Sequence, residues 1–241
     1  MKLTEKHSLI VSVLCLSVVF CGFVSAEGSK DAPLYSSKNA YSESVYFAQA
    51  PSMKTPEKEL SECLFRVARQ VSMRQEVFVR YILSSKKDSD GKIWKSESTV
   101  LDFDQNNSIA IMEKMTVLKV RQSKEGTEAL VKINGNKELK NISVSIKTQI
   151  DGKGNPLWVT SVPKGSKFYA SVGSIQQTTN LADAFYNADT NAIGALALFT
   201  AKPEVSGGTS LYEATLKGVY IARRWYNPSE NRYYSLAILP R

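Results

Sequence analysis

The residues from Asp102 to Glu113 have the types and the spacing of a calcium-binding loop. Positions 1, 3, 5 and 12 of an EF-hand loop carry oxygen ligands, and here they hold Asp102, Asp104, Asn106 and Glu113. The apolar residue that such a loop has at position 8 is Ile109. This pattern lets a loop surround a hard cation. The segment is therefore a candidate metal site, and calcium is the one cofactor that the sequence indicates.

The surroundings of this loop favour a more ordinary interpretation. A second partial match runs from Lys86 to Glu97, but its first ligand position holds Lys86, a cation where a carboxylate is needed. Only Ser98 to Leu101 separates the two loops, whereas paired EF-hands place two helices there. Residues 77–83 and 115–120, which flank the two loops, have the pattern of strands. Acidic turns between strands explain the same residues without a metal.

A second candidate site combines rings and guanidinium groups near the C-terminus. Its residues are Arg224, Trp225 and Tyr233, which would act as a stacking platform for a glycan or a nucleic acid. Flat rings and guanidinium groups bind planar or apolar ligand faces. The alternative follows from the two-residue period of a strand, in which one set of side chains faces a helix and the other set forms cross-strand pairs.

The N-terminus predicts export. Two cations, Lys2 and Lys6, precede an apolar run from Leu9 to Phe23, and the small residues of Val24-Ser25-Ala26 follow it. This is the order of a signal peptide, so we expect residues 1–26 to be removed and the protein to be periplasmic or associated with the cell envelope.

A membrane tether is not expected. The apolar run is shorter than the roughly 20 residues of a spanning helix. Lipidation requires a small residue before the modified cysteine, but Cys15 follows Leu14 and Cys21 follows Phe20. The sequence therefore predicts neither a transmembrane span nor a lipid anchor.

The residue types that remain after such a cleavage exclude several kinds of catalysis. The only histidine is His7, which lies within the predicted signal peptide. A mature chain without imidazole has no Ser-His-Asp or Cys-His system and no His-ligated metal. Cys63 would be the only mature cysteine, and its place in an apolar helical stripe predicts a buried, inert thiol. We therefore expect no catalytic residue and no enzyme activity.

The charge pattern does not point to nucleic acid. The 31 lysines and arginines exceed the 23 acids, for a net charge of +8. These cations are interleaved with acids and form no long run, unlike the basic patch of a nucleic-acid-binding protein. The expected partners are other envelope proteins or further copies of this chain.

The elements that position these residues occur twice in the order strand, helix, strand, strand. In the first copy an apolar run at 46–52 precedes Thr55, which caps a helix through Val71, and a hairpin follows over 115–133. In the second copy a run at 168–174 precedes Thr178-Thr179, a helix through Phe199 and a hairpin over 219–239. The first copy has two extra strands, at 76–83 and 94–103.

The expected fold class is therefore α+β, with two tandem small modules, each a helix packed on an antiparallel sheet. A disordered leader at 27–43 follows the signal peptide. The first module spans 44–135, a connecting segment spans 136–155, and the second module spans 156–241.

The second module resembles the twenty-kilodalton Lpp lipoprotein family, which also includes the FlgP and FlgT type flagellar envelope proteins. The resemblance is carried by Pro156-Leu157-Trp158-Val159 with Pro163 and Lys164, by the strand Phe168–Ser174, and by the closing segments Leu216–Val219, Arg224–Pro228 and Tyr233–Ala237. It implies a non-catalytic envelope component that serves as a structural or protein-interaction module in an oligomeric assembly. The alternative is an exported protein that binds calcium or an acidic glycan. The chain departs from the family by lacking the lipidation motif.

Overall fold

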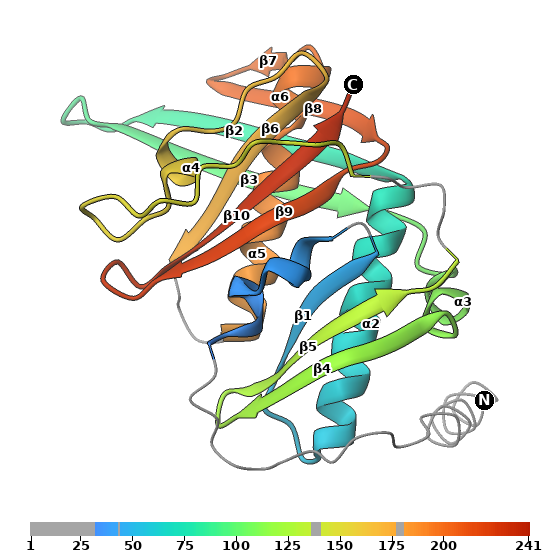
Figure 1. Cartoon of the computed structure of the whole chain (residues 1–241). Helices are drawn as coiled ribbons and strands as arrows, with labels where there is room; N and C mark the ends of the chain where they lie inside the picture. Colours follow the sequence, from blue (N-terminus) through green and yellow to red (C-terminus); the bar gives the residue numbers. More distant parts are fainter. Residues whose placement is uncertain (1–31, 43, 136–140, 177–180) are drawn as a thin grey trace, which may run out of the picture.

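The computed structural model describes residues 32–42, 44–135, 141–176 and 181–241 (Figure 1). The predicted signal peptide at residues 1–26 and the predicted helix cap at Thr178-Thr179 lie outside these residues. The described residues form helices and three antiparallel sheets, so the expected mixed α+β content is confirmed.

The first sheet carries a long helix on one face. Its strands are β1 (Val45–Pro51), β4 (Met115–Ser123) and β5 (Gly126–Ile133), in the order β1-β5-β4. Helix α2 (Pro56–Gln75) begins after Thr55, whose side chain accepts a hydrogen bond from the Lys58 N–H. The apolar stripe of α2 then packs on the sheet through Cys63, Val67 and Val71. The predicted cap, helix and hairpin are confirmed.

The second sheet repeats the strand order of the first. Its strands are β6 (Phe168–Gln176), β9 (Tyr220–Asn227) and β10 (Arg232–Pro240), in the order β6-β10-β9. Helix α5 (Leu181–Ala195) packs on one face, and the short helix α6 (Ala197–Thr200) follows it. The single helix predicted through Phe199 is thus divided into two. The division lies where the Leu196 N–H bonds to the Ile193 carbonyl, three residues back instead of the four of an α-helix. In each half, therefore, one strand and one hairpin form a three-stranded sheet, and a helix packs on that sheet.

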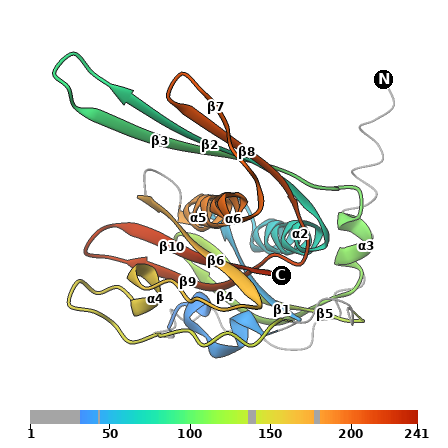
Figure 2. The same cartoon turned by 90° about the horizontal axis from the view of Figure 1, so that it is seen from above.

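A third sheet joins the two halves. It contains β2 (Val77–Lys87), β3 (Ile93–Asp102), β7 (Glu204–Ser206) and β8 (Thr209–Leu216), in the order β3-β2-β8-β7. The central pair brings β2 of the first half against β8 of the second. Figure 2 shows α2, α5 and α6 as a layer between this sheet and the other two. The sequence predicts β2 and β3, but β7, β8 and this joint sheet are not predicted.

Residues 32–42 of the predicted leader take up local structure and contact the folded part of the chain. Two short 3-10 helices, Leu34–Ser36 and Lys38–Tyr41, lie against the first and second sheets. Leu34 is buried, and its N–H donates to a carboxylate oxygen of Glu128 at 2.9 Å. Leu34 and Ala40 complete a core with Phe47 and Phe185. A few apolar residues thus hold a segment whose average composition is polar.

The described part of the connecting segment packs against the second sheet. Ile142, Val144 and Ile146 alternate along the chain and pack on the face of the second sheet that is turned away from α5. Helix α4 (Leu157–Thr160) places Trp158 in the same cluster, where it is 2% exposed. The second sheet is therefore covered on both faces.

Candidate functional site

A buried ion pair lies where the two halves meet. Arg224 of β9 donates to Asp189 of α5 from both Nε and Nη2, at 3.0 and 2.7 Å. The Ser235 hydroxyl donates to the same carboxylate at 2.6 Å, and Gln70 of α2 accepts from Arg224 Nη2 at 3.0 Å. The side chains of Arg224 and Asp189 are only 3% and 8% exposed. The charges are therefore withdrawn from solvent but fully paired with each other.

Strand register brings these groups together. Ser235 of β10 lies opposite Arg224 of β9, and both side chains reach the face covered by α5. Gln70 also donates to the Phe47 carbonyl on β1 at 2.9 Å, which extends the cluster to the first sheet. The carboxylate Asp189 lies within the apolar stripe of α5, four residues after Phe185. Sequence reasoning missed this cluster. The signal that could have found it is the position of Asp189, because an acid on a buried helix face needs a partner.

The electrostatics of the cluster stabilise the charged form of Arg224. Burial opposes the positive charge of Arg224, but the Asp189 carboxylate outweighs this effect and raises the pKa of Arg224 above its ordinary value. For Tyr41, which lies beside the pair, burial is the main cause and raises the pKa above its ordinary range. Groups that keep one protonation state over the physiological range are poor proton donors or acceptors in catalysis. The cluster fixes the two halves to each other and does not resemble acid–base machinery.

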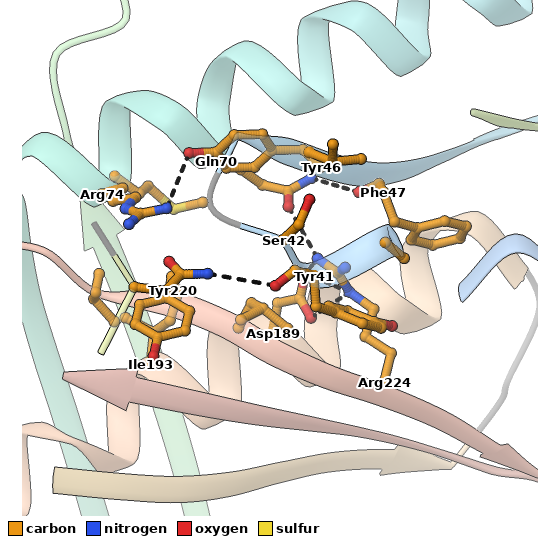
Figure 3. Close-up of a pocket in the computed structure, with 16 residues that line it drawn as sticks. Tyr41, Ser42, Tyr46, Phe47, Gln70, Arg74, Asp189, Ile193, Tyr220 and Arg224 are labelled. Carbon is orange, nitrogen blue, oxygen red and sulfur yellow. Dashed lines mark hydrogen bonds and ion pairs between the residues drawn. The ribbon is translucent and has the colours of Figure 1, made fainter. Parts of the chain in front are cut away.

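A small cavity opens beside this cluster (Figure 3). It has a volume of about 30 Å³, and on this measure about 10–15 Å³ is enough for one water molecule. Its lining includes Tyr41, Tyr46, Arg74 and Tyr220. The Arg74 guanidinium donates to the Tyr46 hydroxyl at 3.3 Å and lies over the Tyr220 ring. The space accommodates ordered water but is too small for a cofactor or a sugar.

The predicted platform of Arg224, Trp225 and Tyr233 is not formed. Arg224 is 5% exposed, and Tyr233 is 2% exposed because it packs against Phe185 and Tyr226. Trp225 belongs to the core on the opposite face of the sheet, and its indole N–H donates to the Gly154 carbonyl at 3.1 Å. This prediction is wrong, and the two-residue period of the strands accounts for the three residues.

The predicted calcium ligands do not converge. Asp102 is the last residue of β3, whereas Glu113 follows the short helix α3 (Ser108–Met112). Asp104 accepts hydrogen bonds from the Asn106 N–H and the Asn107 side chain, at 2.8 and 3.0 Å. Within the part of the chain that the structure describes, no group of three or more His, Cys, Asp or Glu residues could hold a metal. The geometry is that of an acidic turn between a strand and a short helix.

The second partial loop, from Lys86 to Glu97, is the turn of the β2–β3 hairpin. Asp88 accepts from the N–H groups of Asp90 and Lys92, at 3.0 and 2.8 Å. It also accepts from the Trp94 indole N–H at 2.9 Å. These bonds hold the pKa of the Asp88 carboxyl below its ordinary value, with the bond from Trp94 as the largest cause. The carboxylate therefore closes a turn and fixes an aromatic ring.

Cys63 is the buried thiol that its position in the helix predicts. It is 0% exposed, and its Sγ donates to the Thr127 carbonyl at 3.3 Å. Burial is the main cause that raises the pKa of this thiol to about 12. The reactive thiolate is thus far rarer near neutrality than for an ordinary thiol.

We therefore expect Cys63 to escape alkylation while the protein is folded. Iodoacetamide at pH 8 should leave the peptide that contains Cys63 unmodified in native buffer and label it fully in denaturant, as read by mass spectrometry. Equal labelling under the two conditions would contradict the burial of this thiol.

Comparison of the chain with protein-family models, with curated proteins and with solved structures finds no match. The resemblance to the Lpp lipoprotein family therefore rests on the residues quoted above. Among the described residues, none of the helices is both long enough and apolar enough to cross a membrane.

Proposed function

We propose that this protein is a non-catalytic, exported component of the cell envelope that acts through protein contacts, as a structural or interaction module. The observation that carries the proposal is a contrast between the interior and one surface. The central polar cluster is paired and the cavity beside it holds little more than water. The third sheet, however, presents large apolar side chains to solvent, and Ile93, Trp94 and Val205 are 62%, 57% and 72% exposed.

The proposal includes an origin by duplication. Both three-stranded sheets place the first strand of their half beside the last, with the hairpin partner outside, and both carry a helix that follows the first strand. We infer that the two halves derive from one module of the Lpp-like kind. The shared third sheet then makes the pair a single folding unit, because β2 and β8 each complete the other's sheet.

The test is fractionation of the source cells followed by crosslinking mass spectrometry on the intact envelope. We expect the protein in an envelope or periplasmic fraction, with its N-terminus at Glu27. Lysines of the β2–β3 hairpin, such as Lys87 and Lys95, should crosslink to another polypeptide or another copy. Lys132 and Lys153, which lie outside the third sheet, are matched controls that should give fewer such links. Recovery in the cytoplasm, or links within one chain only, would overturn the proposal.

A further inference from the structure

Strand β3 forms an open edge of the third sheet. Among the described residues it pairs with β2 alone, and none of its ten side chains is buried. Figure 2 shows that the β2–β3 hairpin extends beyond the helix layer, so that its outer part has no cover from α5 or α6. An exposed edge of this length offers unpaired backbone groups to another strand unless the protein blocks it. Lys95 is the only cation within β3.

The tip of this hairpin holds an aromatic side chain in a fixed orientation. Trp94 is 57% exposed, yet its indole N–H is bonded to Asp88 and the Lys92 ammonium lies 4.4 Å from the ring centroid. An exposed ring that is already ordered loses little entropy when it is buried in an interface. Tryptophan is also among the residues that contribute most to binding at such surfaces.

We propose that β3 is the site at which a second copy of this chain binds, by antiparallel pairing of the two β3 strands about a twofold axis at Ser96. This inference rests on the proposed function and names the surface and the partner. In this register Lys95 lies opposite Glu97 of the second copy, and the symmetry forms the pair twice. The two strands would merge the third sheets of both copies into one continuous sheet.

Charge selects this register over its neighbours. An axis at Lys95 would place two ammonium groups opposite each other, and an axis at Glu97 would place two carboxylates opposite each other, which destabilises a sheet. The third sheet already contains an opposite-charge cross-strand pair, because Arg80 lies opposite Glu213 with 2.6 Å between Nε and Oε1. The axis at Ser96 adds pairs of the same kind across the edge, on the other face of the sheet.

Apolar contacts fit the same register. Side chains alternate between the two faces of a strand, and Thr99 lies against Gly194 of α5. Trp94 and Val100 therefore both point away from the helices. With the axis at Ser96, Trp94 lies diagonal to Val100 of the second copy, within reach of an aromatic side chain. Val100 is 54% exposed in the single chain, so the pairing would cover both residues.

The first test is a disulfide at the axis, in the full chain expressed in an exporting host. In this register the Cα atoms of the two Ser96 residues are about 4.5–5.5 Å apart, within the range that a disulfide spans. Ser96→Cys should give a covalent dimer with copper phenanthroline as the oxidant. Ser98→Cys is the matched control on the same face, and it should crosslink at least tenfold less because it lies opposite Trp94 of the second copy. Equal crosslinking of the two variants, or none, would overturn the register.

The second test uses charge reversal and sedimentation equilibrium. The wild-type chain should show a concentration-dependent equilibrium between monomer and dimer. Lys95→Glu should weaken the dimer about tenfold, and the double variant Lys95→Glu with Glu97→Lys should restore it. Lys132→Glu makes the same charge change outside the third sheet and should have no effect.

A wild-type chain that stays monomeric, a dimer that Lys95→Glu leaves unchanged, or growth beyond a dimer would overturn the proposal. Crosslinks to other envelope proteins in the source cells would still support the proposed function in that case, so failures of the two proposals are distinguishable.

Discussion

Replacement of Asp189 by alanine is expected to lower the free energy of unfolding by about 3–5 kcal/mol, because it leaves a buried cation without its counter-ion. Arg224 would keep neutral partners such as Gln70 but no counter-ion from Asp189, at a position where it is 5% exposed. The Ser235 hydroxyl would lose its acceptor at the same time. Urea unfolding followed by circular dichroism measures the change.

Asp183→Ala is the matched control on the same helix. Asp183 pairs with Arg66 at 3.0 Å, but its side chain is 50% exposed and Arg66 also pairs with Glu62. An exposed pair of this kind contributes at most about 1 kcal/mol. If the two alanine variants had equal effects, the Asp189 pair would not have the structural role assigned to it.

A double replacement separates the cost of an unpaired charge from the value of the pair. Asp189→Leu combined with Arg224→Met removes both charges, and apolar residues of similar volume replace buried ion pairs with little loss. We expect the double variant to be more stable than Asp189→Ala alone. Such a recovery would mean that the pair specifies how α5 docks on β9 and β10 rather than adding to stability.

Local patterns predict most individual elements of this fold but not their long-range pairing. The Thr55 cap and the two hairpins follow from residues close in sequence, and each lies where expected. The pairing of β2 with β8 joins Val79 to Ala214, and no local pattern encodes a contact over that separation. Strand β8 was also missed, and the short β7 before it pairs with β8 over only three residues.

The site was mispredicted because adjacent residues on a strand have opposite environments. Arg223 and Arg224 have the same chemistry, and a register shift between Leu236 and Ala237 lies next to Arg223, which is opposite Leu236. The structure buries Arg224 against Asp189, while Arg223 lies partly exposed with its guanidinium over the Tyr41 ring. Composition cannot decide between the two arginines, so the aromatic and basic residues of β9 and β10 were interpreted as a surface.

Gly173→Ala is expected to destabilise the protein by about 3 kcal/mol, the upper part of the range for overpacking a core. A Cβ at this position would lie 2.1 Å from the Ala192 nitrogen and 2.3 Å from the Ala188 carbonyl oxygen. Both atoms belong to the backbone of α5, so no side-chain rotation relieves the clash and the helix must move. Thermal unfolding measures the loss, and Gly152→Ala is the control because a Cβ there meets nothing within 4 Å.

The position of Gly173 connects this clash to the ion pair. Gly173 lies opposite Ser235 in the sheet, and Ser235 donates to Asp189. The close approach of α5 to β6 therefore sets the distance at which Asp189 meets its partners. In the Gly173→Ala variant the displaced helix already weakens the Arg224–Asp189 pair, before Asp189 itself is replaced. We expect Asp189→Ala to cost less in the Gly173→Ala background than in the wild-type chain. Strictly additive losses would show that the glycine and the ion pair act independently.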